Sequence, residues 1–527
     1  MKKYIRRVSR YIIVDILFDI LCTVFAAYIP VMHKELFDSL AQGTLSRIPA
    51  ITAVFIVLQG LSCACVYLCM LCTWKIAITF ETAMKKDLIS ALLHKEKQSF
   101  YAYSTNDYIS IQGNDITAIE QDYLTPWIDV FRSVNMFVIY AVVIVVYVDW
   151  RIALTIILSS LLVVIGPKIT GKIMSDRRMD YQNQMAAYIS CITDLLNGYK
   201  LVSRFTRNNL LKVHERTLHA TADKRYAYGR SKTLSLSIND AAIQIIQITS
   251  FICACALLIN GEISVGAGVA TFSYVSSFIS PLESILYDVS AIQSTDAVRK
   301  KFLHMISTGI RKDQPVPRKV ERGISLRNVD YHNGGFRIRI DSLDFERGKK
   351  YAIVGGNGCG KSTLLKLIMQ YLEPDSGTIS LDGIPICGLD TSACISYIDQ
   401  NEYIYHAGIH DNVTIFDSYP DARQQIRDVF WQKSADPEDV DCQKMSGGER
   451  QLIAFLRVAA QDTPIVLMDE PFAAMDVVNT KKMQDYLLES RDMADKTVII
   501  ITHDVSEETL AKYDAVVRAD AFRVCET

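Results

Sequence analysis

The sequence lacks a marked excess of charge of either sign. Lys and Arg number 56 and Asp and Glu number 58, so the formal net charge is only −2. A protein that binds the phosphate backbone of a nucleic acid needs a strongly basic surface, so nucleic acid is not an expected partner. The 13 cysteines also lack the spacing of a disulfide framework, and free thiols are therefore expected.

Long apolar runs are confined to residues 1–290, whereas residues 318–527 alternate short apolar runs with Gly, Asp and Ser clusters. A helix needs about 20 mostly apolar residues to cross about 30 Å of hydrocarbon. Six segments meet this requirement, namely 11–32, 49–73, 130–149, 150–171, 240–261 and 264–287. No small-residue cleavage site follows the basic start, so the first span is expected to be retained.

Basic side chains are concentrated before the first span and between the fourth and fifth spans. The connections on the opposite side are short and poor in Lys and Arg. Because basic segments stay on the cytoplasmic side, both termini are predicted to be cytoplasmic. The chain is therefore expected to be a multi-pass integral protein of a bacterial-type plasma membrane.

Two long excursions between spans, residues 75–130 and 172–238, carry apolar residues at helical spacing. Helices that run well past the membrane would reach a soluble partner, although a solvated hairpin without a partner is the simpler alternative. Pro315 and Pro317 lie in a polar stretch with no apolar period. We therefore predict an α-helical membrane domain over residues 1–310, a linker over 311–320 and an α/β domain over 321–527.

An eight-residue glycine-rich run follows the apolar strand that begins at Tyr351. It reads Gly355, Gly356, Asn357, Gly358, Cys359, Gly360, Lys361 and Ser362, and a helical run starts at Thr363. This is the P-loop pattern in its expected context, in which backbone N–H groups and a helix N-terminus bind phosphate. Lys361 is expected to meet the β- and γ-phosphates of ATP, and the Ser362 hydroxyl to bind Mg²⁺.

Polar side chains also follow three other strands predicted for this domain. Asp469 and Glu470 close a continuous apolar run, His503 follows a second run, and Gln400 follows a third. Ligands sit at the carboxyl ends of strands in open α/β sheets. Asp469 is therefore predicted to hold Mg²⁺ through water and Glu470 to polarise the attacking water.

A second anion site is predicted where Ser446 caps a helix that starts with Gly447, Gly448 and Glu449. One chain cannot bring both anion sites to the same γ-phosphate. Two copies that face each other could do so.

Taken together, these motifs make the whole chain resemble a half-size ABC exporter. The resemblance implies a dimer in which Ser446 and Gly448 of one subunit close over the ATP bound at Lys361 of the other. It further implies that Gln400 contributes to the Mg²⁺ site, that His503 acts as the switch histidine, and that membrane extensions meet the ATPase near Gln400. The loop after the Asp469 strand matches at Ala473-Ala474-Met475-Asp476.

The chain departs from the family pattern at several positions. The signature carries Met445 and Glu449 in place of the usual residues, and the region from Asp411 to Ser446 is short. By register Asn333 takes the place of the aromatic residue that stacks on adenine. Tyr331 is the candidate for that role, with Phe336 nearby, and the alternative is that Tyr331 only packs within its strand.

The predicted function is ATP-driven export of an amphipathic or hydrophobic molecule, such as a drug, a lipid or a peptide, by a dimer of half-transporters. A homodimer is favoured and a heterodimer stays open, as does a membrane ATPase that senses without translocation. Importers of this kind usually keep spans and ATPase on separate chains, which disfavours import.

Polar residues of the spans are predicted to line the substrate path, or alternatively to pair with Lys or Arg near helix ends. These residues are Asp15, Asp19, Asp240, Gln244, Gln247 and Glu283.

Overall fold

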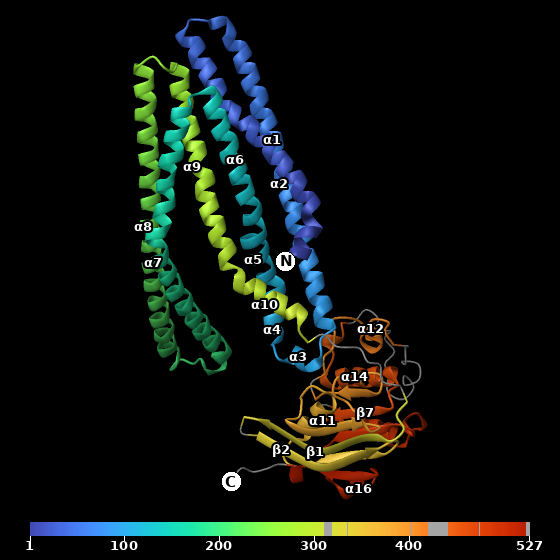
Figure 1. The fold of residues 1–527 in the computed structure, drawn as a ribbon. Helices are drawn as coiled ribbons and strands as arrows, with labels where there is room; N and C mark the ends of the chain where they lie inside the picture. The colour runs from blue at the N-terminus through green and yellow to red at the C-terminus, as the bar shows by residue number, and fades with distance from the viewer. Residues whose placement is uncertain (310–318, 335, 401, 420–440, 474, 523–527) are drawn as a thin grey trace. The chain divides into compact units, whose positions relative to one another are not determined.

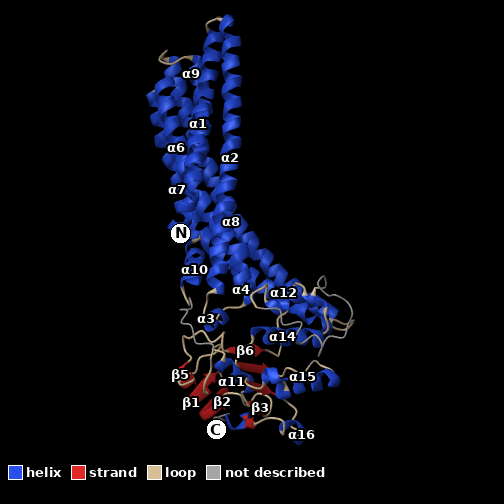
Figure 2. Cartoon of the chain, turned by 90° about the vertical axis from the view of Figure 1, so that its right-hand side faces the viewer, coloured by secondary structure: helices blue, strands red, loops and turns tan. Residues whose placement is uncertain are grey.

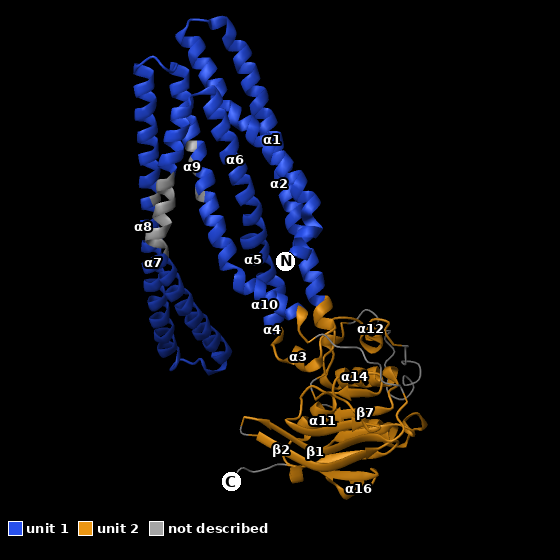
Figure 3. Cartoon of the chain, in the orientation of Figure 1, with its two compact units in different colours: residues 1–89, 106–306 blue, residues 90–105, 307–527 orange. Residues whose placement is uncertain are grey.

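A computed structural model describes residues 1–309, 319–334, 336–400, 402–419, 441–473 and 475–522, with the side chains of 161–171, 239, 276, 279 and 283 outside the description. The chain divides into two compact units, one of residues 1–89 and 106–306 and one of residues 90–105 and 307–527 (Figure 3). Most of the predicted linker, 311–318, lies outside the described residues. The predicted domain bounds stay a prediction.

The first unit consists of helices, and the strands are confined to the second unit (Figure 2). The helices are α1 (Lys2–Ala41), α2 (Ile48–Leu93), α4 (Thr105–Ser110), α5 (Ile116–Ile119), α6 (Thr125–Tyr147), α7 (Trp150–Asn197), α8 (Arg207–Ile259), α9 (Val265–Ser294) and α10 (Asp296–Ser307). Short 3₁₀ or π turns, η1 (Leu45–Arg47), η2 (Ile111–Asp115), η3 (Glu120–Leu124) and η4 (Gly198–Leu201), join or extend them.

Five helical stretches among the described residues are long and apolar enough to cross a membrane. They are Lys2–Ala41, Leu45–Leu93, Thr105–Tyr147, Arg207–Ile259 and Val265–Ser307. The fourth predicted span, 150–171, lies in α7, and within that span only the shorter apolar stretch Trp150–Ser160 has described side chains. The prediction of six spans is consistent with this arrangement.

Polar caps set where two of these helices begin. The Asp149 side chain accepts a hydrogen bond from the Arg151 backbone N–H and starts α7, and Ser264 caps α9 in the same way through Ala267. Each cap satisfies a backbone N–H that a helix start leaves without a partner. Asp149 therefore sets where the turn after α6 ends and α7 begins.

The predicted helical character of the two long excursions is confirmed. The helix α2 continues to Leu93, and α7 and α8 pack against each other as a long antiparallel pair (Figure 1).

In α9, Gly266 lies so close to α1 that an added Cβ would overlap the Lys34 carbonyl oxygen. Asp38 of α1 accepts hydrogen bonds from the Gly266 N–H and the Ser264 hydroxyl, both 2.8 Å long. Glycine is thus required where the two helices meet.

The second unit contains two sheets. The antiparallel sheet has the order β2-β1-β4-β5 and the parallel sheet the order β6-β7-β8-β3-β9. The strands are β1 (Gly323–Asn333), β2 (Phe336–Glu346), β3 (Lys350–Val354), β4 (Ser376–Leu381), β5 (Ile384–Pro385), β6 (Ile395–Ile398), β7 (Ile465–Asp469), β8 (Thr497–Ile501) and β9 (Ala515–Arg518). The helices are α3 (Lys97–Tyr101), α11 (Lys361–Ile368), α12 (Ile409–Thr414), α14 (Gly447–Gln461), α15 (Val477–Glu489) and α16 (Glu507–Leu510).

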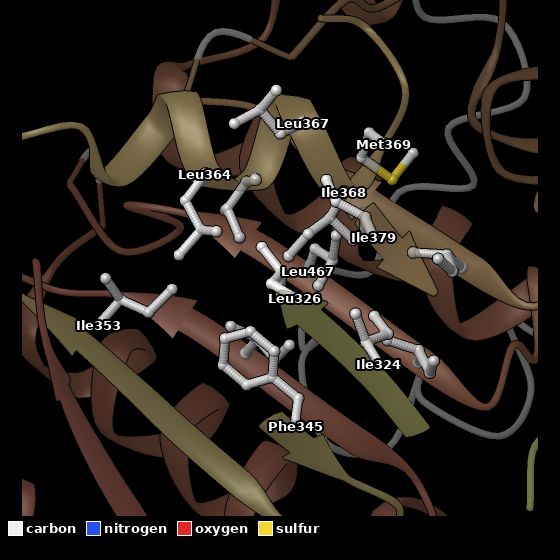
Figure 4. Packing of buried hydrophobic residues seen from close by; sticks show 14 of the residues in the cluster. Ile324, Leu326, Phe345, Ile353, Leu364, Leu367, Ile368, Met369, Ile379 and Leu467 are labelled. Carbon is white, nitrogen blue, oxygen red and sulfur yellow. The ribbon is translucent and has the colours of Figure 1, made fainter. Parts of the chain in front are cut away.

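A hydrophobic core joins the two sheets through α11 (Figure 4). Leu326 and Phe345 come from the antiparallel sheet, Ile353 and Leu467 from the parallel sheet, and Leu364 from α11. On the other face of the parallel sheet, α14 and α15 pack over a second cluster. The strands β3, β7 and β8 are buried along their whole length, as their continuous apolar runs predicted.

The segment of residues 90–105 packs against the rest of the second unit through specific contacts. Lys97 Nζ donates a 3.1 Å hydrogen bond to the Met369 carbonyl and lies 4.9 Å from the centre of the Tyr371 ring. The rings of Tyr101 and Tyr371 meet edge to face at 5.2 Å. The contacts of α3 explain why this segment belongs with the sheets.

Candidate nucleotide-binding site

The glycine-rich run forms the loop between β3 and α11, where the sequence placed it. Gly360 precedes the first residue of α11 with a φ of 104°, and an added Cβ there would lie 2.7 Å from Ile338 Cγ2. Only glycine suits both the conformation and the space. The tight loop aims the start of α11, including Lys361, Ser362 and Thr363, at the carboxyl end of the sheet.

Lys361 is buried, with 6% of its surface exposed. Its ammonium group donates to the carbonyl oxygens of Gly355 and Gly356 at 2.9 and 3.0 Å. The backbone carbonyl oxygens of the loop therefore bind the Lys361 ammonium group. Charged phosphate oxygens would be stronger acceptors for it than these carbonyl oxygens. Gly358 and Gly360 both have positive φ angles, which lets the intervening backbone curl.

Four adjacent parallel strands end at the same edge of the sheet, and predicted site residues lie at the end of each. Gln400 follows β6, Asp469 ends β7 and Glu470 comes directly after it, His503 follows β8, and the P-loop follows β3. These strands are adjacent in the order β6-β7-β8-β3. The convergence that the sequence predicted is therefore present.

Glu470 is the centre of a three-residue hydrogen-bond group. Gln400 Nε2 donates to Glu470 Oε2 at 2.9 Å, and His503 Nε2 lies 2.5 Å from Glu470 Oε1. Glu470 has a φ of 49°, in the left-handed region that costs a non-glycine residue about 1–2 kcal/mol. Strain of this kind is found at functional positions, where the surrounding structure holds it.

Asp469 is suited to a divalent cation. It is 3% exposed, and its buried Oδ1 has no hydrogen-bond partner in the described part of the chain. Burial raises the pKa of Asp469, and a hydrogen bond from the Ser362 hydroxyl partly offsets that effect. An orphaned carboxylate oxygen beside a hydroxyl is the donor set that Mg²⁺ prefers, so the residues fit the ion.

The signature segment begins α14 with a complete capping box. The Ser446 hydroxyl accepts from the Glu449 N–H at 3.4 Å, and the Ser446 N–H donates to Glu449 Oε2 at 2.9 Å. The departure from the family pattern at Glu449 thus reinforces the helix start. Gly447 and Gly448 form its first turn, and Ala474 of the loop after β7 lies outside the described residues.

Two residues of this site were missed or only noted in passing. Asp520, after β9, accepts a 2.9 Å hydrogen bond from the Gly356 N–H, a contact that no local motif signals. The Phe336 ring lies beside the P-loop, with its Cζ 3.3 Å from where a Cβ on Gly360 would be. Tyr331 and Phe336 are both half-buried, and both pack against the core between the sheets. Because its ring also lies beside the P-loop, Phe336 is the residue that we favour for contact with the nucleotide base.

In the first unit, some polar residues of the spans pair with neighbours. Arg132 Nη2 donates to both oxygens of the fully buried Asp15 at 2.6 and 2.7 Å, and Asn135 donates to Asp19 at 3.1 Å. The alternative of pairing with Lys or Arg holds for Asp15. Asp240 and Gln244 are exposed in the single chain, Gln247 is half-exposed, and the Glu283 side chain lies outside the described residues.

Two family models match the chain. The model of the ABC transporter transmembrane region matches residues 12–282, and the ABC transporter model of the ATPase matches residues 338–473. One match lies in each predicted half, in the predicted order.

Curated relatives and a solved structure are also similar. An ATP-dependent lipid A-core flippase of Mannheimia succiniciproducens is 21% identical over 512 residues, 92% of this chain and 85% of that protein. A mesentericin transport and processing ATP-binding protein of Leuconostoc mesenteroides is 24% identical over 77% of this chain, which spans 58% of that relative. The structure of a bacterial Atm1-family ABC exporter with ATP bound has a TM-score of 0.80 at 19% identity, covering 97% of this chain and 94% of that one.

Proposed function

Because the chain belongs to the ABC transporter family, in which it is a membrane-embedded transport ATPase, we propose that two copies export an amphipathic or hydrophobic molecule by hydrolysing ATP. The observation that carries the proposal is the grouping of Gln400, Glu470 and His503 beside the P-loop of a chain that also holds the spans. Both termini are assigned to the cytoplasm of a bacterial-type cell.

Each residue of the site has a proposed role in hydrolysis. The P-loop N–H groups and Lys361 bind the phosphates, and Glu470 accepts a proton from the attacking water. His503 and Gln400 orient the Glu470 carboxylate through the hydrogen bonds already described. Ser362, Asp469 and Gln400 would hold Mg²⁺, which when bound offsets the charge on the phosphate oxygens.

The dimer is proposed because one chain supplies only part of each ATP site. Ser446 caps α14, whose positive N-terminal end is the proposed second anion site, and the family resemblance pairs it with the P-loop of a second chain. The tip between α7 and α8 also carries apolar side chains that water solvates poorly: Tyr199, Leu201 and Phe205 are 72%, 75% and 90% exposed. We assign the second half-transporter as the partner of both surfaces.

Transport in sealed vesicles tests the proposal. The purified protein is reconstituted into proteoliposomes, and uptake of fluorescent amphiphiles is followed with ATP outside. ATP-dependent accumulation in the wild type, absent in Glu470→Gln, supports export. ATP hydrolysis without movement of any drug-like, lipid or peptide probe would instead favour a sensing ATPase.

A further inference from the structure

The peptide group between Gly355 and Gly356 lies between two opposite charges. Its N–H donates a 2.9 Å hydrogen bond to Asp520 Oδ1, and its C=O accepts a 2.9 Å hydrogen bond from the Lys361 ammonium group. The positive end of the peptide dipole thus meets a carboxylate, and the negative end meets a cation. A peptide turned the other way would present its N–H to the ammonium group, so the two charges select one orientation.

The register of the parallel sheet brings Asp520 to this position. The strands β3 and β9 are neighbours in which Val354 pairs with Arg518, and two residues further along the chain come Gly356 and Asp520. The carboxylate also lies close to the loop, because both of its oxygens would be 3.2 Å from a Cβ added to Gly355. The end of β9 therefore places a carboxylate against the start of the P-loop.

Two successive glycines need such support to keep one conformation. Gly355 has a φ of 154°, and glycine has more backbone freedom to lose than any other residue. Lys361 also holds this peptide, but a lysine that moves onto phosphate oxygens gives up its contacts with carbonyl oxygens. A carboxylate has no attraction for phosphate, so Asp520 can keep its contact when nucleotide is bound.

We propose that Asp520 is a positioning residue, which holds the P-loop in the conformation that binds the phosphates of ATP. This inference rests on the proposed role of the P-loop in phosphate binding and does not depend on export. The hydrogen bond to the Gly356 N–H, and not the negative charge by itself, carries the effect, because an unpaired carboxylate near the loop would repel phosphate.

Two substitutions separate the hydrogen bond from the charge. Asp520→Ala removes both, whereas Asp520→Asn removes the charge and keeps an oxygen that can accept from the Gly356 N–H. Loss of the hydrogen bond in Asp520→Ala should raise the Kd for ATP about fivefold. Since Asp520 does not touch the reacting atoms, kcat at saturating ATP should stay within about twofold of the wild type. Asp520→Asn should bind ATP within about twofold of the wild type.

Binding and turnover are measured on the full-length protein in lipid nanodiscs. Equilibrium binding of ATP is followed with Mg²⁺ withheld, so that no ATP is hydrolysed, and kcat and KM are then measured with Mg²⁺ present. Thermal unfolding of each variant shows whether it is folded. Asp492→Ala, the same change at an exposed position of η7 (Arg491–Met493), serves as the control and should leave binding and turnover as in the wild type.

A thiol of the P-loop reports on the loop without nucleotide. Cys359 is 4% exposed, and its Sγ would lie 2.9 Å from a Cβ added to Gly355, so its burial depends on the path of the loop. In Asp520→Ala, iodoacetamide should modify Cys359 about threefold faster or more, because the loop opens more often. Mass spectrometry of the labelled peptides measures the rates. The fully buried Cys394, just before β6, reports loosening of the whole domain and should react as in the wild type.

Three results would overturn the proposal. The first is tighter ATP binding in both Asp520 variants, which would show that the carboxylate acts by repelling phosphate. The second is a wild-type Kd and wild-type labelling of Cys359 in folded Asp520→Ala. The third is faster labelling of Cys394 together with Cys359, which would assign Asp520 to the stability of the whole domain. None of these measurements involves movement of a transported molecule, so a failure of export would leave their outcome unchanged.

Discussion

The Glu470 carboxylate accepts from Gln400 on one oxygen and is hydrogen-bonded to His503 on the other. Glu470→Gln should retain ATP binding but lower turnover by about 10²–10⁴-fold, because an amide cannot accept the proton of the attacking water. ATPase assays and nucleotide-binding measurements on the purified variant check this. Glu489→Gln, the same change on the surface of α15, serves as the control, and wild-type turnover in Glu470→Gln would assign the base elsewhere.

Phe336 should contribute to binding of the nucleotide base. The loss of a base–aromatic contact costs about 1–3 kcal/mol, so Phe336→Ala should raise the KM for ATP by about tenfold with a smaller effect on kcat. Tyr331→Ala is the matched comparison: both rings pack against the core, so both variants should lose stability, but only Phe336→Ala should also raise the KM. A reversed pattern would place the base on Tyr331.

At the scale of the elements, Asp382 fixes the start of β1 to the turn between β4 and β5. Its carboxylate accepts from the backbone N–H groups of Glu321, Arg322 and Gly323 at 2.7–2.9 Å. Burial acts to raise the pKa of Asp382, but these backbone hydrogen bonds outweigh it and hold the pKa below its ordinary value. The charged carboxylate therefore stabilises the fold.

Asp382→Asn should lower the free energy of unfolding by about 1–2 kcal/mol at neutral pH. A group with a lowered pKa stabilises the protein above its unfolded pKa of about 3.9, and this contribution is lost as pH falls through the folded pKa. The difference between variant and wild type should accordingly shrink below about pH 4. Denaturation of the full chain at pH 7 and pH 3.5 measures it, and a constant difference would contradict the role of the charge.

The sequence predicted elements whose signal is local and missed contacts made by packing. The apolar runs of β3, β7 and β8 and the residues at their ends were readable, because strand, turn and helix follow one another in the chain. The contact of Asp520 with the P-loop was not predicted, and for Asp15 a Lys or Arg partner was one of two alternatives without Arg132 being named, because both contacts join residues far apart in the sequence. Nothing in either local pattern specifies its partner.

At the scale of the whole molecule, the chain order predicted a membrane half and an ATPase half, and both family models agree. The grouping of residues 90–105 with the second unit was not predicted. That grouping depends on Lys97 and Tyr101 meeting Met369 and Tyr371, which a scan for apolar periodicity does not detect.

Two equivalent composite ATP sites are predicted for a homodimer. Lys361→Ala damages the P-loop and Ser446→Ala the signature, so each variant alone should lose most ATPase activity. In a mixed dimer one site carries both lesions, while the other joins an intact P-loop to an intact signature. Co-expression should restore part of the activity, measured on dimers purified through two different tags. No recovery in confirmed mixed dimers would favour a different partner chain or strict dependence on two working sites.

The length of α7 and α8 has a mechanical consequence. With 53 residues, α8 extends about 80 Å, well over twice the roughly 30 Å of a bilayer core, and α7 braces it along its side. A pair of helices packed along its length is expected to rotate as one rigid body. A rotation of about 5° around its middle moves each end by about 3.5 Å, in opposite directions. A force that draws one end of the pair inward therefore spreads the other end outward, with no bend in either helix.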